Sequence, residues 1–434
     1  MKLWDKGYTV NDKIEQFTVG KDRELDLYLA KYDVLGNMAQ AKMLAKVGLI
    51  SEIEKSQLLE GLNQLLLFIE KGEFIIEDEF EDVHSKIEHF LTEKYGEAGK
   101  KIHTARSRND QVLTDLQLFY KDYIKKIVST IESFIKILLE KAEKHKTDLF
   151  PGYTHFQAAM PSSFGLWFSA YAEQLIIDLY LFEAAFKTAD QNPLGSAAGF
   201  GSSFPVDREF TTNELGFGNL LISSVGAQML RGKSEKALSF ALAQTAGTIG
   251  KLAYDLVLYN GQEFGFLQLP KEFTTGSSIM PHKKNPDVFE LTRAHCNKIQ
   301  SLPNALILAT NNLPSGYHRD FQVLKEILFE PMMQLLDLID INAFAIEKLQ
   351  VVKDKINQPM YDAIYTVENI NKQIQEGIPF RDAYRNVAME VENGTFVPNK
   401  EFATTHTGSI HNLGLDKIQE KLNRFLAETP IRKS

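Results

Sequence analysis

Residues 112–145 read VLTDLQLFYKDYIKKIVSTIESFIKILLEKAEKH and contain neither glycine nor proline. Their apolar side chains recur at spacings of three and four residues, at Leu116, Tyr120, Tyr123, Ile124, Ile127, Ile131, Phe134, Ile135 and Leu138. This period is typical of a helix that buries one face. At a rise of 1.5 Å per residue, the predicted helix is roughly 50 Å long.

Four further long helical patterns follow this stretch, at residues 161–190, 233–262, 286–311 and 320–352. Pro303 and Pro331 predict kinks in the last two. Long helices joined by loops predict a helix bundle of about five helices. Residues 175–182 are apolar on more than one face, which favours burial against other subunits and hence a homo-oligomer. The alternative is a monomer whose central helix is surrounded by its own neighbours.

The whole chain is predicted to be all-α, with the long bundle at residues 106–352 flanked by two smaller helical domains at 1–105 and 353–434. Helical periodicity at 25–47 and 51–71 supports the N-terminal domain. Ser51 and Glu54 have the spacing of a capping box. In the C-terminal domain, Gly377-Ile378-Pro379 separates two short helices.

Composition excludes several classes of protein. The net charge of −9 argues against a general nucleic-acid binder, although the basic run 100–108 keeps that reading open as a weak alternative. The single cysteine, Cys296, excludes an intrachain disulfide framework. No window reaches membrane-spanning length, and the first residues lack an apolar signal core, so we expect no membrane association and a cytoplasmic location.

The loop 275–287 reads TGSSIMPHKKNPD and is the most unusual segment of the chain. Gly276 and the paired serines give mobility, and the two prolines prevent a continuous helix. All of its charges before Asp287 are positive, and Met280 is unusual for a solvated turn. Most Gly/Ser/Pro loops are plain surface turns. A mobile cationic loop, however, suits closure over an anionic small molecule.

Four other breaks between the predicted helices carry polar groups, at residues 103–111, 152–157, 193–201 and 313–325. The first crowds two arginines, whose guanidinium groups bind carboxylates in bidentate fashion; alternatively, Asp110 pairs with Arg106 in a capping loop. The second holds His155 among hydroxyl and amide groups, and an imidazole suits proton transfer near neutral pH. The third is glycine-rich, but it lacks the Lys and Ser/Thr of a nucleotide-binding loop.

These segments resemble a known family. The sequence Gly-Ser-Ser-x-Met-Pro-x-Lys-x-Asn-Pro at 276–286 resembles the signature of the fumarase/aspartase superfamily, whose members release fumarate by β-elimination. Ser107-Arg108-Asn109-Asp110-Gln111, Gly-Tyr-Thr-His-x-Gln at 152–157 and Tyr-x-Arg-Asp-x-Gln at 317–322 are similar to motifs of the argininosuccinate lyases. The departures are Asn37, Ala105, Leu230, Gly232, His318 and the pair Val323-Leu324, where that family usually has other residues.

The resemblance implies a set of site residues. The implied catalytic residues are Ser277, His155, Lys283, Asn285 and Glu290. The implied substrate-binding residues are Asn37, Ser107, Arg108, Asn109, Thr154, Arg231, Tyr317, Gln322 and Lys325. In this reading Ser277 is the general base, His155 oriented by Glu290 handles the proton of the leaving group, and Lys283 with Asn285 stabilises the carbanion.

The resemblance further implies cleavage of argininosuccinate to arginine and fumarate without a metal or an organic cofactor. It implies a homotetramer in which each site takes loops from three subunits. Two alternatives stay open: a sister lyase acting on adenylosuccinate, aspartate or malate, and a non-enzymatic structural protein on the same fold, such as a delta-crystallin. A purely structural role gives no reason to keep His155, Ser277, Lys283 and Glu290 together.

Overall fold

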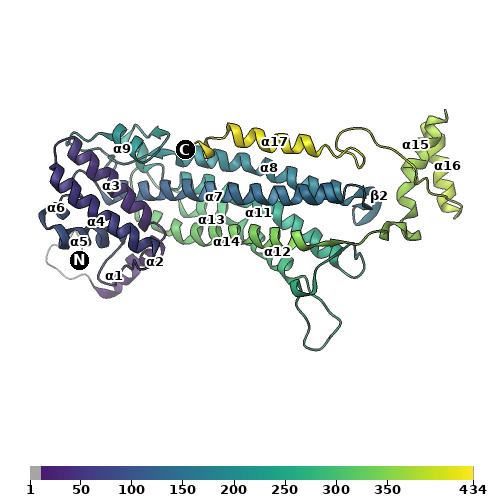
Figure 1. Cartoon of the computed structure of the whole chain (residues 1–434), viewed down its shortest axis with the longest axis horizontal. Coiled ribbons are helices and arrows are strands. Elements are labelled where there is room, and N and C mark those ends of the chain that lie inside the picture. The colour runs from purple at the N-terminus through teal and green to yellow at the C-terminus, as the bar shows by residue number, and fades with distance from the viewer. Residues whose placement is uncertain (1–10, 434) are drawn as a thin grey trace.

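The computed structural model describes residues 11–433, and the predicted absence of a signal core concerns residues outside this range. The prediction of an all-α fold is confirmed. Its centre is a bundle of long helices that lie side by side (Figure 1). They are α7 (Arg108–Lys144), α8 (Phe164–Ala189), α11 (Lys233–Asn260), α12 (Asp287–Ile299), α13 (Leu302–Ala309) and α14 (Val323–Lys348). The apolar face predicted for residues 112–145 is buried in the core that these helices share.

The two prolines that were predicted to kink long helices, Pro303 and Pro331, lie in different settings. The predicted helix 286–311 is two helices, because α12 ends at Ile299 and α13 starts at Leu302, with Pro303 in its first turn. Proline fits the first turn because its missing N–H has no intrahelical partner there. Pro331, in contrast, lies inside the continuous helix α14.

The start of α8 differs from the prediction. We expected this helix to begin near Pro161, but residues 149–163 form a hairpin of β1 (Leu149–Thr154) and β2 (Gln157–Ser163). The hydroxyl of Ser163 accepts the N–H of Leu166 and caps α8, which begins at Phe164, three residues later than expected. Two further two-stranded sheets pair β3 (Gln191–Asn192) with β4 (Asn219–Leu220) and β5 (Leu267–Gln268) with β6 (Gln350–Val351).

The N-terminal helices pack at one end of the bundle around a core of their own (Figure 1). Helices α3 (Ala30–Lys46), α4 (Glu52–Glu70) and α5 (Val83–Tyr95) build this core, and α1 (Asp12–Val19), α2 (Asp22–Asp26) and α6 (Glu97–Lys100) lie at the same end. The predicted capping box is confirmed, since Ser51 and Glu54 exchange side-chain and backbone hydrogen bonds at the start of α4. Short helices α9 (Arg208–Glu214) and α10 (Ser224–Gln228) lie near this end.

At the other end, α15 (Thr366–Gln375) and α16 (Phe380–Glu392) pack around a small cluster of their own. The turn at Gly377 separates them as predicted. The last helix, α17 (Leu415–Glu428), returns along α8 and joins the bundle core through Ile418, Leu422 and Phe425 (Figure 1). The predicted domain boundaries stay a prediction.

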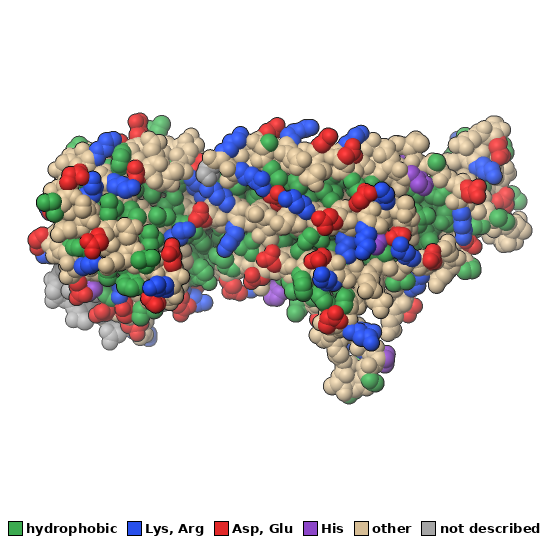
Figure 2. All heavy atoms as spheres, viewed as in Figure 1, with side chains coloured by type: hydrophobic (Ala, Val, Ile, Leu, Met, Phe, Trp, Pro, Cys, Tyr) green, Lys and Arg blue, Asp and Glu red, His purple; other side chains and the backbone are tan. Residues whose placement is uncertain are grey.

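The bundle exposes apolar side chains, as the pattern at residues 175–182 suggested. Ile177, Tyr180 and Leu181 on α8 and Phe240 on α11 are between 39% and 54% exposed. Hydrophobic side chains reach the surface between the charged ones along the bundle (Figure 2). Within residues 11–433, every helix is too short or too polar to cross a membrane.

Candidate active site

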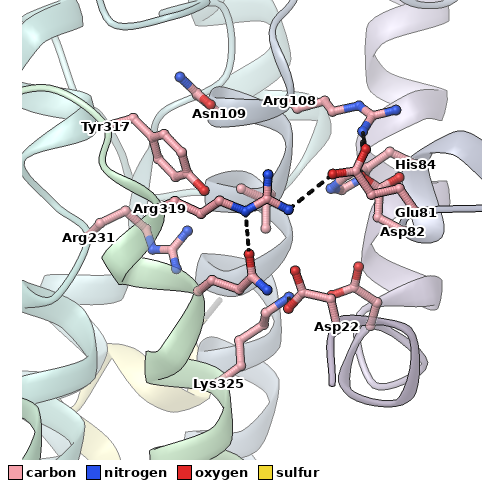
Figure 3. Close-up of a pocket in the computed structure, with 13 residues that line it drawn as sticks. Asp22, Glu81, Asp82, His84, Arg108, Asn109, Arg231, Tyr317, Arg319 and Lys325 are labelled. Atoms are coloured by element: carbon pink, nitrogen blue, oxygen red, sulfur yellow. Dashed lines mark hydrogen bonds and ion pairs between the residues drawn. The ribbon is translucent and has the colours of Figure 1, made fainter. Parts of the chain in front are cut away.

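A pocket of about 220 Å³ lies where the N-terminal helices meet the start of α7 and the segment before α14 (Figure 3). The residues that line it are Asp22, Asp26, Glu81, Asp82, His84, Arg108, Asn109, Val112, Arg231, Tyr317, Arg319, Gln322 and Lys325. Six of the nine predicted substrate-binding residues are among them. The structure therefore brings together residues that are more than 200 positions apart in the sequence.

Arg108 owes its position to the capping of α7. Ser107 and Asp110 form a capping box at the start of this helix, which makes Arg108 its first residue. The Arg108 guanidinium donates to Asp82 at 2.8 Å, to Glu81 at 3.2 Å and to the hydroxyl of Ser85 at 2.8 Å. These contacts join the N-terminal helices to the start of α7.

Asp110 does not form the hydrogen-bonded pair with Arg106 that the capping-loop alternative requires. One of its oxygens accepts the N–H of Ser107, and the other accepts the N–H groups of Gly195 and Ala197. Burial raises the pKa of this carboxyl to about 6, although the N–H donors and Arg106 oppose the shift. Asp110 thus joins the arginine segment to the glycine-rich segment, which sequence reasoning treated as separate.

Lys325 is buried between two carboxylates. Its Nζ lies 2.6 Å from Oδ1 of Asp26 and 2.7 Å from Oδ1 of Asp22. Burial alone would lower the pKa of Lys325, but the two carboxylates outweigh burial and raise it. Burial raises the pKa of Asp22 to about 6, against the opposing effect of Lys325. The predicted substrate-binding ammonium group is therefore charged and held in place.

The segment before α14 supplies two further polar groups, and the segment before α11 supplies a third. Arg319 donates to Glu81 at 3.1 Å and to the carbonyl of Thr18 at 2.8 Å, while Gln322 donates to the same carbonyl at 2.9 Å. Arg231 is buried and donates to the carbonyl of Phe321 at 2.7 Å. The backbone at the end of α1 therefore holds Arg319 and Gln322 in place beside the pocket.

Two predicted substrate-binding residues lie behind the pocket. Asn37, in the middle of α3, is buried, accepts from Arg106 at 2.6 Å and donates to the carbonyl of Asp33. The hydroxyl of Ser107 accepts the N–H of Asn109 at 3.3 Å. In this structure both residues support their neighbours and do not line the cavity.

Sequence reasoning missed a buried polar cluster next to the pocket, formed by Asp33, His84 and Asp115. His84 Nδ1 lies 3.0 Å from Asp33 Oδ1, which also accepts from Gln111 at 2.7 Å. Burial would lower the pKa of His84, but Asp33 outweighs it and raises the pKa, whereas burial raises the pKa of Asp115.

The cluster offers nitrogen and oxygen donors close enough for a metal ion, yet the His84–Asp33 ion pair and the buried Arg106 already balance its charge. The signal in the sequence was an acidic residue, Asp115, inside the stretch that we predicted to be a buried helix.

The predicted catalytic residues and the predicted substrate-binding residue Thr154 lie elsewhere. Thr154 and His155 are at the tip of the β1–β2 hairpin, beyond the far end of α7, and both are exposed (Figure 1). His155 and Phe156 have φ angles of 54° and 57°, which are unusual for residues other than glycine. Since α7 has 37 residues, about 54 Å separate this hairpin from the pocket.

The loop 275–286 projects from the bundle as a third, separate group (Figure 1). Its base is closed by reciprocal backbone hydrogen bonds between Thr275 and Asn285 of 3.2 and 2.9 Å. The side chain of Asn285 donates to the carbonyl of Gly276 at 3.3 Å. The hydroxyl of Ser277 accepts the N–H groups of Ile279 and Met280, at 3.4 and 3.2 Å.

Lys283 is exposed on this loop, and Glu290 is exposed in the first turns of α12. The chain therefore divides the predicted site residues into three places: the pocket with the two residues behind it, the hairpin tip, and the projecting loop with the start of α12.

The chain is similar to known proteins in sequence and in fold. Residues 9–301 match the family model described as Lyase. The argininosuccinate lyase of Bacteroides fragilis is 52% identical over 98% of this chain and 95% of its own length. That of Thermotoga neapolitana is 42% identical over 89% and 97%. A solved structure of EDDS lyase with formate has a TM-score of 0.76 at 20% identity, over 97% of this chain and 92% of that one, and shows the fold alone.

A relative that is 52% identical over almost the full length of both chains shows the family of this chain. The chain belongs to the argininosuccinate lyase family.

Proposed function

We propose that this protein is an argininosuccinate lyase, which eliminates fumarate from argininosuccinate reversibly and leaves arginine. The main support is that Arg108, Asn109, Tyr317, Gln322 and Lys325, taken from two distant segments, meet in one pocket. Its mixture of cations and carboxylates suits a substrate that carries both carboxylate and ammonium groups. The names of the relatives point to the same substrate.

The difficult step of such an elimination is removal of a proton from the carbon beside a carboxylate, because negative charge then accumulates on that carboxylate. Preorganised N–H donors and cations lower this barrier. Ser277 is the proposed base. Two backbone N–H groups already point at its oxygen, and the same donors stabilise the oxygen when it is negatively charged. Lys283 and Asn285 on the same loop would stabilise the carbanion.

His155 would protonate the departing nitrogen, with Glu290 orienting its ring. Thr154 would help to position the substrate from the hairpin tip. The active unit is then a homotetramer in which three chains supply the pocket, the hairpin tip and the loop to each site. The separation of about 54 Å along α7 supports this arrangement, as do the apolar side chains exposed on α8 and α11. We further propose a cytoplasmic location.

The proposed reaction is tested by measuring the release of fumarate through its ultraviolet absorbance. A panel of argininosuccinate, adenylosuccinate, aspartate and malate separates this function from that of sister lyases, and absence of turnover on all four would favour a structural role. Ser277→Ala should abolish turnover, while Ser278→Ala, one position away on the same loop, is the matched control. If Ser277→Ala retained near-parental turnover, another group would be the base.

Subunit mixing tests the shared site. A Ser277→Ala chain supplies an intact pocket, and an Arg108→Ala chain supplies an intact loop. In a mixed tetramer some sites combine both intact parts, so turnover should rise well above that of either variant alone. No recovery after verified subunit exchange would contradict sites that are shared between chains.

A further inference from the structure

We infer that His84 is a positioning residue of the pocket. As a buried cation it offsets the carboxylates of Glu81 and Asp82, so that the arginines bound to these carboxylates stay available to an anionic substrate. This inference rests on the proposed function, and it assigns a role to the Asp33–His84–Asp115 cluster, which sequence reasoning missed.

The charge of His84 follows from the group on its inner side. Its Nδ1 lies 3.0 Å from Oδ1 of Asp33, a carboxyl that is fully buried. Burial would raise the pKa of Asp33, but the positive charge of His84 outweighs burial and lowers it. Since a buried carboxylate without a counter-charge is strongly unfavourable, the proton shared by this pair stays on the imidazole. Nδ1 therefore donates to Asp33, and His84 is an imidazolium.

The other charges behind His84 cancel one another. Asp115 Oδ2 lies 3.8 Å from His84 Nδ1, and burial raises the pKa of Asp115 well above its usual range, which favours the neutral form. The buried guanidinium of Arg106 offsets the charge of Asp33. The positive charge of His84 is therefore uncompensated on the side of the cluster that faces the pocket.

On its outer side, His84 belongs to the wall of the pocket that holds an arginine. Figure 3 shows its ring beside the side chains of Glu81 and Asp82, and all three residues line the cavity. Burial would raise the pKa of Asp82, but the positive charges of His84 and Arg108 outweigh burial and lower it. His84 thus stabilises the ionised carboxylate that fixes the guanidinium of Arg108.

The charges of this wall show why a further cation is needed. Arg108 donates to both Glu81 and Asp82, and Arg319 donates to Glu81. These two carboxylates and two guanidinium groups cancel, so without another charge the wall attracts an anion no better than a cation. His84 adds one positive charge. Argininosuccinate carries one carboxylate more than it carries cationic groups, so its net charge is complementary to the wall.

The size of the pocket sets the size of the effect. A cavity of about 220 Å³ keeps a bound carboxylate within about 10 Å of the residues that line it. At an effective dielectric constant of about 20, a unit charge at about 10 Å changes the affinity for an opposite unit charge roughly 15-fold. Loss of the charge weakens binding of an anion and does not weaken binding of a cation, whereas loss of packing weakens both.

Calorimetric titration of the assembled protein with succinate and, separately, with arginine measures this difference. His84→Gln should raise the Kd of succinate at least about 15-fold, while the Kd of arginine stays within about twofold of parent or falls. This variant leaves Asp33 without its counter-charge. The double variant His84→Gln with Asp33→Asn removes that burden on folding, and it should still raise the Kd of succinate at least about threefold, because the cation nearer to the pocket is gone.

The matched control is His89→Gln. His89 lies on the same helix, α5, with Nε2 3.4 Å from Oε1 of Glu93, and it does not line the pocket. This variant should bind both ligands as the parent does. Three results would overturn the inference: equal weakening of succinate and arginine in both His84 variants, parental affinity for both ligands in these variants, or no binding of succinate by the parent.

The titration needs no turnover, so it separates this inference from the proposed reaction. A parent that binds succinate with this dependence on His84 but releases no fumarate would keep the inference and refute the reaction. Fumarate release by the parent, with ligand affinities that do not change in the His84 variants, would do the reverse.

Discussion

Replacement of Lys325 by methionine tests how far the pocket depends on the positive charge of this side chain. The side chain of Lys325 is almost fully buried, and its ammonium lies 2.6 and 2.7 Å from the carboxylates of Asp26 and Asp22. Methionine has a similar length and no charge, so Lys325→Met removes the ammonium and leaves little empty space. Asp26 is only 2% exposed and is left without its main counter-charge.

Removing one partner of a buried ion pair costs about 3–5 kcal/mol, because the remaining charge is uncompensated. We therefore expect Lys325→Met to lower the free energy of unfolding by about 4 kcal/mol at pH 8. The difference in free energy of unfolding between parent and variant must become smaller at acidic pH. Without the ammonium, the pKa of Asp22 rises above its present value of about 6, so protonation in the fold relieves the repulsion. Stability of the variant thus falls as the pH rises from about 4 through that pKa, and the deficit is smallest near pH 5.

Urea unfolding at fixed protein concentration, at pH 5 and pH 8, measures both effects. The double variant Lys325→Met with Asp26→Asn is the control, since it removes the stranded charge and should recover most of the loss. Fumarate release should stay at least about 100-fold below parent in both variants, because a charged contact to substrate worth about 3 kcal/mol is gone. A deficit under about 1 kcal/mol at pH 8, or a larger deficit at pH 5, would refute this account of the pocket.

Three further substitutions test other parts of the structure. Asp110→Asn should lower fumarate release at least about tenfold, because an amide has one acceptor oxygen and cannot accept hydrogen bonds on both sides; parental activity in this variant would contradict it. Gly165→Ala should destabilise by about 1–3 kcal/mol, since its Cβ would stand 2.6 Å from Cα of Lys146, whereas Gly247→Ala, with only a side chain at 3.6 Å, should not. Asp178→Asn should stabilise the fold by up to about 3 kcal/mol above pH 7, because burial raises the pKa of Asp178 to about 6 and the ionised carboxylate is therefore unfavourable in the fold. The variant should lose that advantage below pH 4. Equal stability of variant and parent at pH 8 would count against a buried, ionised Asp178.

The sequence by itself determined the helical class and the ends of most long helices. The period of apolar residues in 112–145 predicts which face of α7 is buried, and the spacing of Ser51 and Glu54 predicts the cap of α4. Both features are readable from the sequence because they depend on residues only a few positions apart. The resemblance of local motifs to those of the argininosuccinate lyases also implied Arg108, Tyr317 and Lys325 as site candidates.

Only the tertiary structure decided which candidates meet. Arg108 and Lys325 share a pocket, while His155 and Ser277 lie far from it in the same chain. Nothing in a local pattern specifies such distances, since they follow from how whole helices cross. The same holds for the buried Asp33–His84–Asp115 cluster, whose members come from three helices. Helical periodicity depends on contacts within a few residues, whereas a site depends on contacts between segments that only packing brings together.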